Sequence, residues 1–136
     1  MTKSKQKCRR GKIREVIELN KRQVGNEYEA IAAEYLKKKG YRILEKNYYT
    51  PFGELDIIAD KDGILCYIEI KYRSSKKYGN PLEAVDFRKQ RRISKSAMYH
   101  YMTHGAKQKK ACRFDVIGIN AEHQITHVEN AFPYCE

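Results

Sequence analysis

Residues 53–71, GELDIIADKDGILCYIEIK, predict two β-strands joined by a tight turn. Asp62 and Gly63 favour a type I′ hairpin turn, because that turn needs positive φ at both central positions and Asp-Gly adopts it readily. Counting outward from this turn places Asp56 opposite Glu69. Cross-strand neighbours have Cβ atoms about 4.5–5.5 Å apart, so we expect the two carboxylates to share a small volume.

The two faces of this predicted hairpin differ in character. Side chains alternate along a strand, so Lys71 points the same way as Glu69, and Asp56 joins them at the open end of one face. The other face is apolar and is expected to be buried; it carries Leu55, Ile57, Ala59, Ile64, Cys66, Ile68 and Ile70.

Two ionised carboxylates at this separation repel each other, so either one takes up a proton or a cation lies between them. Mg²⁺ is bound mainly by one or two carboxylates together with retained waters, which suits Asp56 and Glu69. A neighbouring lysine, Lys71, can orient a water molecule and offset charge that builds on a phosphate. The alternative is a solvated strand face on which Glu69 forms a salt bridge with Lys71.

The composition favours a single domain with a polyanionic partner. A chain of 136 residues is long enough to bury its own hydrophobic core. Lysine and arginine together number 28 and aspartate and glutamate 17, which gives a net charge of +11 at pH 7. A balance this basic most often indicates nucleic acid as the partner. The same surplus of positive charge also suits solubility, contact with an acidic protein, or contact with a membrane surface.

The cysteines and the apolar runs bear on location. Cys8, Cys66, Cys112 and Cys135 are scattered, without a C-x-x-C motif or histidines at zinc-finger spacing, so reduced thiols and a cytoplasmic setting are expected. No apolar run follows the basic N-terminus, and none reaches the length of a transmembrane helix. We therefore expect a soluble protein without a membrane partner.

The N-terminal part predicts a basic arm and then a helix. Residues 1–12 are rich in lysine and arginine, and a weak helical stripe follows to residue 24; the arm follows a phosphate backbone or is a solvated tail. Asn26 favours an N-cap and Gly40 a C-terminal left-handed residue, so a helix is expected over residues 26–39. Its buried face consists of Tyr28, Ile31, Ala32, Tyr35 and Leu36.

Two glutamates flank that apolar stripe. Glu27 and Glu29 lie roughly 100° to either side of Tyr28, so periodicity does not choose between them as an additional acid for the site. Glu29 also follows Asn26 by three residues and would complete a capping box, which is the more common role for that pattern.

A first strand is expected over residues 41–49, followed by a turn at 50–53. After the hairpin, residues 73–80 are expected to form a basic loop, which either closes over a phosphate or is an exposed linker. Asn80 and Pro81 start a helix expected to run to about residue 103. Its core side carries Leu82, Val85, Ile93, Ala97 and Tyr101. Its other faces carry positive charges without the opposite-sign partners that would stabilise a lone helix, which favours a backbone-binding surface over a merely solvated face. These basic residues are Arg88, Lys89, Arg91, Arg92 and Lys95.

The C-terminal part predicts two strands, over residues 113–119 and 125–129. Asp115 is expected to pair with Arg113 rather than to join the carboxylate pair. His100 and His104 have the i, i+4 spacing of metal ligands, but no glutamate follows His100 as in the H-E-x-x-H zinc motif. We therefore expect them to be ordinary helix-end residues.

This order of elements, with carboxylates at a hairpin and E-x-K on its second strand, resembles the PD-(D/E)xK nuclease superfamily, which has the restriction-endonuclease-like fold. The chain more closely resembles the YraN family of bacterial proteins with inferred endonuclease activity, which are similar to archaeal Holliday-junction resolvases. The resemblance covers about residues 25–132 and rests on an ordered set: Glu29, Ala32, Ala33, Tyr35, Leu36, Gly40-Tyr41, Asn47-Tyr48, Gly53-Glu54-Leu55-Asp56, Glu69-Ile70-Lys71, Arg73, Lys89-Gln90, Arg113-Phe114-Asp115-Val116 and Asn130-Ala131-Phe132.

The resemblance implies a three-layer α/β fold, with a mixed central sheet flanked by helices. It implies that Asp56 and Glu69 bind Mg²⁺, with Mn²⁺ as a substitute, and that the backbone carbonyl of Ile70 is a further ligand. It also implies that Lys71 positions or activates the attacking water.

The resemblance favours Glu29 over Glu27 as the acid that the first helix contributes to catalysis. The chain departs from the family pattern at two positions. Leu55 stands where the superfamily has proline, which is a common variation. Tyr28 stands where this family often has glycine, and it bears on how Glu29 approaches the metal.

The expected protein is therefore a metal-dependent endonuclease acting on DNA, including branched or junction DNA. The alternative is a non-catalytic module on the same fold that binds DNA or RNA. We expect a basic N-terminal arm over residues 1–24, a nuclease-like domain over 25–132 and a C-terminal tail over 133–136. A symmetrical cut at a junction would need a homodimer, and the sequence does not determine whether one forms. The residues assigned to nucleic-acid binding are Arg73, Arg88, Lys89, Gln90, Arg92 and Lys95.

Overall fold

A computed structural model describes residues 25–73, 80–105 and 109–136. The predicted arm over residues 1–24 and most of the loop after residue 73 lie outside the described residues. An α-helix covers residues 25–38. It is followed by strands β1 (Arg42–Thr50), β2 (Gly53–Lys61) and β3 (Ile64–Arg73), the 3₁₀ turn η1 (Pro81–Ala84), helix α2 (Phe87–His100), the π-helical turn η2 (Tyr101–Gly105), and strands β4 (Cys112–Asn120) and β5 (Ile125–Phe132).

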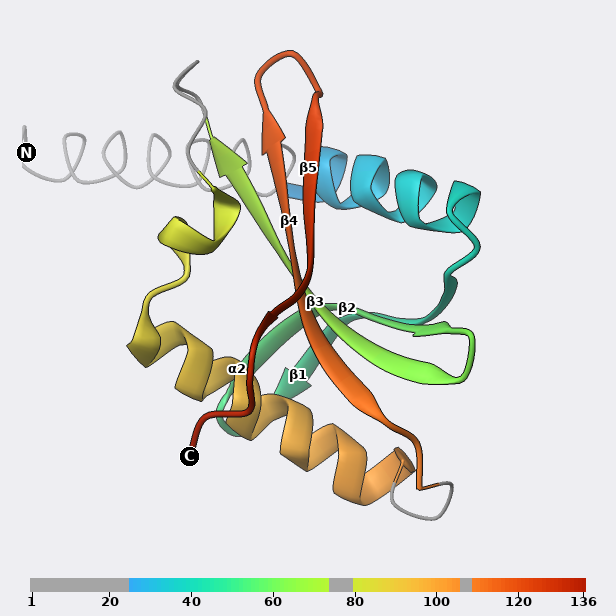
Figure 1. The fold of residues 1–136 in the computed structure, drawn as a ribbon, viewed down its shortest axis with the longest axis vertical. Helices are drawn as coiled ribbons and strands as arrows, with labels where there is room; N and C mark the ends of the chain where they lie inside the picture. The colour runs from blue at the N-terminus through green and yellow to red at the C-terminus, as the bar shows by residue number, and fades with distance from the viewer. Residues whose placement is uncertain (1–24, 74–79, 106–108) are drawn as a thin grey trace, which may run out of the picture.

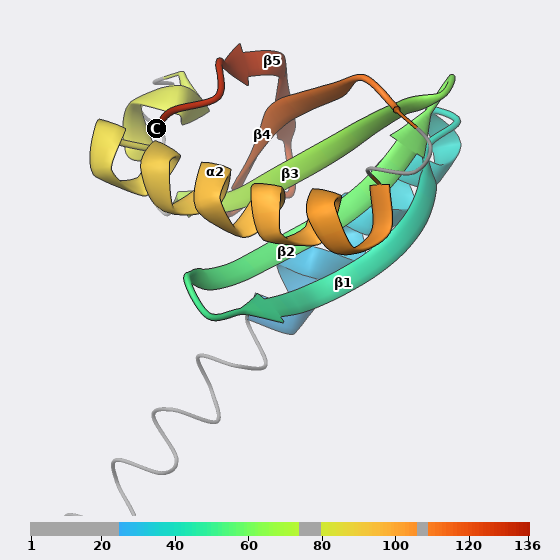
Figure 2. The same cartoon turned by 90° about the horizontal axis from the view of Figure 1, so that it is seen from below.

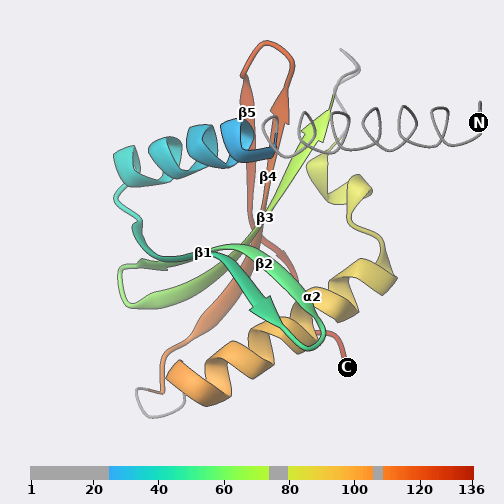
Figure 3. The same cartoon turned by 180° about the vertical axis from the view of Figure 1, so that it is seen from behind.

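The strands form one five-stranded sheet in the order β1-β2-β3-β4-β5 (Figure 1). Neighbouring strands are antiparallel except β3 and β4, which run parallel and are joined by the crossover through η1 and α2. Helix 25–38 and α2 cover opposite faces of the sheet (Figures 2 and 3). The predicted fold, an α/β restriction-endonuclease-like arrangement with a mixed central sheet flanked by helices, is confirmed.

Two hydrophobic cores fill the two faces of the sheet. The core under helix 25–38 is built from Ala32, Ala33, Leu36, Tyr41, Ile57, Ala59, Cys66, Ile68, Ile117 and Ile119. The core under α2 is built from Leu55, Ile58, Leu65, Tyr67, Val85, Ile93, Ala97, Phe114, Val116 and Phe132. Because both faces of the central strands are buried, these strands are apolar on both sides. Within the described ranges, no helix is both long and apolar enough to span a bilayer.

The hairpin predicted from Asp62 and Gly63 is confirmed. Both residues have positive φ, 52° and 83°, as a type I′ turn requires. The β2–β3 ladder runs outward from the pair Lys61–Ile64 to the pair Ile57–Ile68, in the register that the sequence predicts.

The predicted apolar face of this hairpin is wrong at one position. Leu55 packs in the core under α2, whereas Ile57, two residues later, packs in the core under helix 25–38. Strict alternation would place both on one face, so the strand changes orientation at Asp56. Asn47, which lies across from Asp56 between the pairs Lys46–Ile57 and Tyr48–Leu55, also departs from strand geometry with φ 51°.

The bounds of three predicted elements also need correction. Gly25 is already helical, so Asn26 is not the N-cap of the first helix and Glu29 completes no capping box. The helix expected from residue 80 to 103 is divided among three elements: η1 ends at Ala84, α2 begins after Asp86, and η2 begins at Tyr101. Asp86 caps α2 by accepting a hydrogen bond from the Lys89 backbone N–H at 2.8 Å. The last strand runs to Phe132, beyond the predicted residue 129.

Candidate active site

The carboxylate pair lies where β2 and β3 separate. The last pair of their ladder on this side is Ile57–Ile68, and the start of β2 and the end of β3 diverge beyond it (Figures 1 and 3). Asp56 and Glu69 are the next residues on the two strands. The backbone N–H of Ile70 donates to Asp56 Oδ2 at 2.9 Å. The Asp56 side chain therefore bridges the strands at the point where their ladder ends.

Asp56 is held in a strongly anionic environment. Burial and the negative charge of Glu69 raise the pKa of Asp56 to about 8, and Glu29 adds to the shift. The hydrogen bond from the Ile70 N–H opposes the shift, because it favours the ionised form. In this arrangement, a cation placed near Asp56 gains favourable charge interactions with several carboxylates.

Three carboxylates from two elements converge at this point. Oxygens of Glu29, from helix 25–38, and of Glu54 and Asp56, from β2, all lie within 4.8 Å of one another. Asn47 Nδ2 donates to Glu29 Oε2 at 2.9 Å and so orients the glutamate from the neighbouring strand. Burial raises the pKa of Glu54, and the charges of Glu29 and Glu69 raise it further. The structure thus brings together Glu29 and Asp56, as predicted, and adds Glu54.

Two lysines neutralise the other member of the pair. Glu69 is only 7% exposed. Its Oε1 lies 2.9 Å from Lys89 Nζ and 3.6 Å from Lys71 Nζ. Burial and the neighbouring Lys89 ammonium lower the pKa of Lys71. The predicted neighbourhood of Asp56, Glu69 and Lys71 is present, and Lys89 joins it from α2.

This donor set fits a hard divalent cation. Mg²⁺ and Mn²⁺ prefer carboxylate and carbonyl oxygens over nitrogen or sulfur. The described residues offer the carboxylates of Glu29, Glu54 and Asp56 as one cluster, and Glu69 interacts with Asp56 electrostatically. Ile70, whose backbone carbonyl was expected to be a further ligand, donates its backbone N–H to Asp56 Oδ2.

The residues predicted to bind nucleic acid lie in different settings. Arg88, Arg92 and Lys95 are exposed on α2, and the described part of the chain places no acidic partner beside them. Gln90 is engaged inside the protein, where its Nε2 donates to the carbonyl of Val85 at 3.0 Å. Arg73 Nη2 donates to the carbonyl of Asn80 at 2.9 Å.

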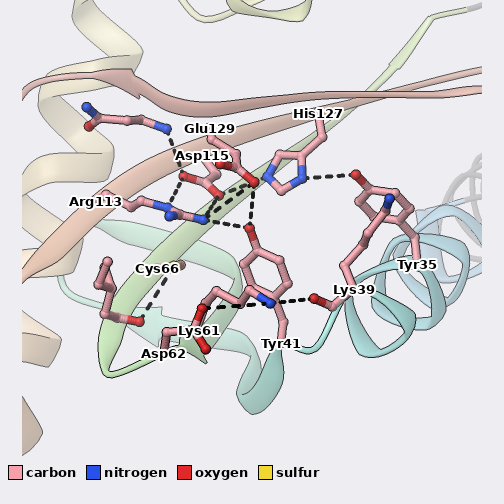
Figure 4. Close-up of polar contacts among 12 residues, drawn as sticks. Tyr35, Lys39, Tyr41, Lys61, Asp62, Cys66, Arg113, Asp115, His127 and Glu129 are labelled. Carbon is pink, nitrogen blue, oxygen red and sulfur yellow. Dashed lines mark hydrogen bonds and ion pairs between the residues drawn. The ribbon is translucent and has the colours of Figure 1, made fainter.

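A buried polar network fixes the helix that carries Glu29 (Figure 4). Asp115 is fully buried and forms an ion pair with Arg113 at 3.0 Å, as predicted. His127 Nε2 lies 2.8 Å from Asp115 Oδ2 and must donate, because a carboxylate only accepts. The other ring nitrogen, Nδ1, lies 3.2 Å from the Tyr35 hydroxyl and is hydrogen-bonded to it. Strands β4 and β5 are thereby linked to helix 25–38.

The two histidines of α2 and η2 have no role in the carboxylate cluster. His100 is buried, and its Nδ1 lies 3.0 Å from the Tyr67 hydroxyl. The rings of His100 and His104 stack with their centroids 4.7 Å apart. The expectation that they are ordinary residues near the helix end agrees with these contacts.

Sequence reasoning missed Glu54, Asn47 and the position of Lys89. A signal for Glu54 was available, since it precedes Asp56 by two residues and alternation places both on one side. No local pattern indicates that Asn47 reaches Glu29 or that Lys89 reaches Glu69, because each contact joins separate elements.

Comparison with known proteins identifies the family. Residues 28–119 match the Uncharacterised protein family UPF0102. A UPF0102 protein of Thermodesulfovibrio yellowstonii is 46% identical over 110 residues, which are 81% of this chain and 96% of the relative. Relatives from Lachnoclostridium phytofermentans (40% identical; 84% of this chain and 96% of the relative) and Myxococcus xanthus (32% identical; 88% and 97%) bear the same family name. The chain therefore belongs to the UPF0102 family, which is the YraN family.

Proposed function

We propose that this protein is a metal-dependent endonuclease that hydrolyses phosphodiester bonds in DNA. The observation that carries the proposal is the meeting of Asp56 and Glu69 at the opening of the β2–β3 ladder, with Glu29, Lys71 and Lys89 around them. The surplus of basic residues and the exposed cations of α2 support a polyanionic substrate.

Each side chain has a role in this proposal. Asp56 and Glu69 hold Mg²⁺, or Mn²⁺ in its place, and Glu29 and Glu54 complete the anionic wall. A bound divalent cation would supply Lewis-acid polarisation of a phosphoryl oxygen. Lys71 orients a water for attack on phosphorus and offsets the negative charge that builds on the phosphate.

The exposed cations would position the substrate rather than select its sequence. Phosphate contacts fix the register of a protein on nucleic acid but carry no base information. Arg88, Arg92 and Lys95 lie on the same helix as Lys89, so a backbone bound along this face of α2 passes beside the carboxylates.

The test is a cleavage assay on labelled duplex, single-stranded, flapped and four-way-junction DNA, with Mg²⁺, Mn²⁺ or EDTA. We expect metal-dependent cutting of at least one structure, reduced about 10²- to 10⁴-fold in Asp56→Asn and in Lys71→Met. Asp62→Asn, at the exposed far end of the hairpin, is the control and should cut like the wild type.

Salt-sensitive DNA binding without cutting under either metal would contradict the proposal. It would instead favour a binding module on the same fold. RNA binding tighter than DNA binding at equal salt would change the substrate class to RNA.

A further inference from the structure

We propose that Phe52 forms a stacking platform for an unpaired nucleobase, beside the candidate active site. This inference rests on the proposed function in one respect only: both require a nucleic-acid strand on this face of α2. It narrows the substrate to nucleic acid with an unpaired segment next to the scissile bond.

Phe52 lies in a surface pocket whose other lining residues are all cationic. Arg88, Arg91, Arg92 and Lys95 of α2 form the remaining walls. Phe52 is 50% exposed, although it lies at the tip of a well-packed hairpin. A half-exposed aromatic ring enclosed by cations suits a ligand that combines a flat π-face with negative charge, which is a nucleotide.

The positive charges of this pocket are available to bind an anionic ligand. In the part of the chain that the structure describes, none of the four forms an ion pair with an acid. Arg91 contacts the Phe87 ring, with its guanidinium carbon 5.1 Å from the ring centroid. Proteins that bind single strands without sequence preference combine such a charged groove with aromatic side chains on which bases stack.

The β1–β2 turn holds Phe52 in a fixed position. Thr50 Oγ1 accepts hydrogen bonds from the backbone N–H groups of Phe52 and Gly53, both at 3.1 Å. The same oxygen lies 3.0 Å from Ser96 Oγ of α2, and Ser96 is buried. The turn is thus tied both to itself and to α2, so Phe52 loses little further backbone freedom when a ligand binds.

The platform is continuous with the carboxylates. Gly53 packs so closely on α2 that a Cβ there would lie 3.2 Å from Arg92 Cδ. Glu54 follows at once and belongs to the acidic cluster. A strand that rests its phosphates on Arg92 can therefore stack one base on Phe52 and continue toward the acidic cluster.

Stacking on Phe52 distinguishes paired from unpaired substrates. In a continuous duplex each base already stacks on its neighbours, and exposing one costs a few kcal/mol. A single strand, a flap or the branch of a junction offers free base faces. Removing the ring should therefore weaken binding to unpaired DNA and leave binding to blunt duplex unchanged.

The experiment measures the affinity of Phe52→Ala and Phe52→Tyr for a labelled single-stranded DNA and for a blunt duplex of the same length. All proteins carry Asp56→Ala, so that the DNA stays intact. We expect Phe52→Ala to weaken single-strand binding by about 5- to 150-fold and Phe52→Tyr to retain it. Tyr134→Ala is the matched control, because Tyr134 is similarly exposed, at 45%, but lines a different pocket.

Unchanged single-strand affinity of Phe52→Ala, or an equal loss on the duplex, would overturn the stacking platform. Failure of the protein to bind either DNA would also overturn it. Cleavage by the unmutated protein is measured separately. Phe52-dependent binding without any cleavage would overturn the proposed nuclease and keep the platform, whereas cleavage with Phe52-independent binding would do the reverse.

Discussion

Lys89 of α2 lies 2.9 Å from Glu69 Oε1 of β3, closer to that oxygen than Lys71, which stands 3.6 Å away on the same strand as Glu69. An ammonium group from the crossover helix α2 therefore lies where the carboxylates concentrate negative charge. The ion pair also ties α2, which carries the exposed arginines, to the strand that carries E-x-K.

Replacing this ammonium group should make the fold more dependent on divalent cations. We expect Lys89→Met to lower the free energy of unfolding by about 1 kcal/mol in EDTA, a modest loss because the Lys89 side chain is 35% exposed. Mg²⁺ should then raise Tm more in Lys89→Met than in the wild type, because binding to the folded state alone is stabilising and the cation supplies the missing charge. Lys95→Met is the control; an equal rise in all three proteins would contradict the prediction.

The hydrogen bond from Asn47 to Glu29 should tune metal affinity. Asn47 has φ 51°, so Asn47→Gly keeps the backbone conformation and removes only the amide. Losing a group that orients a ligand typically costs about 10-fold or more in metal affinity. We expect a corresponding increase in the Mg²⁺ concentration that half-maximal cleavage and half-maximal thermal stabilisation require.

Asn130→Gly is the matched control for Asn47→Gly. Asn130 also has a left-handed backbone, with φ 49°, but lies on β5 beside Asp115. If both variants shift the Mg²⁺ requirement equally, the effect comes from the backbone and not from the amide of Asn47.

Because of Asp115, the free energy of unfolding should depend on pH in the acid range. Burial alone would raise the pKa of Asp115, but hydrogen bonds from His127, Asn130 and Arg113 outweigh it and hold the pKa below its usual range. A carboxyl whose pKa is lowered by folding stabilises the protein fully above its unfolded pKa of about 3.9, and this contribution disappears as pH falls through the folded value.

We therefore expect Asp115→Asn to lower the free energy of unfolding by about 3 kcal/mol at pH 7. Urea unfolding at a series of pH values should show the difference between the two proteins shrinking below about pH 4, where Asp115 of the unfolded wild type becomes protonated, and closing only below the lowered pKa of the folded state. Asp62→Asn, an exposed turn residue, should have almost no effect at either end of the series. If the difference in the free energy of unfolding between the wild type and Asp115→Asn stayed constant down to about pH 2, ionised Asp115 would not be the source of the stabilisation.

DNA affinity should depend on salt through the cations of α2. Each phosphate contact on duplex DNA contributes about −0.9 to the log–log slope of affinity against salt. Arg92→Gln and Lys95→Gln should each make that slope shallower by about this amount, for any duplex sequence. Lys38→Gln, an exposed lysine on helix 25–38 at the other face of the sheet, should leave the slope unchanged. Equal slopes for all four proteins would remove α2 from the interface.

The parts of the fold that depend on local chemistry were predictable. Asp62 and Gly63 specify their own turn, and that turn sets the register of β2 and β3 as far as Ile57–Ile68. The same register, continued by one residue on each strand, predicts that Asp56 lies near Glu69, and the two do interact. The pairing of Asp115 with Arg113 follows from their spacing on one strand.

The parts of the fold that depend on contacts between elements were not predictable from the sequence. The apolar spacing of Leu82, Val85 and Ile93 suits one long helix, so it hides the end of η1 and the start of α2 at the Asp86 cap. The reorientation of β2 at Asp56 goes with the left-handed Asn47 on the neighbouring strand, which no pattern within residues 53–71 contains.

The parallel pairing of β3 and β4 has a consequence for the order of folding. Strands β1, β2 and β3 are joined by two short turns, so their contacts close small loops and form quickly. Pairing β3 with β4 must wait until the long crossover through η1 and α2 is closed. Asp56 and Glu69 should therefore meet early, in a meander without Lys89, and the lysine should reach Glu69 only when α2 docks. The carboxylates of Asp56 and Glu69 thus come together before Lys89 can offset their negative charge. Divalent cations are expected to reduce this repulsion, so divalent cations in the refolding buffer should speed formation of the β1–β2–β3 meander.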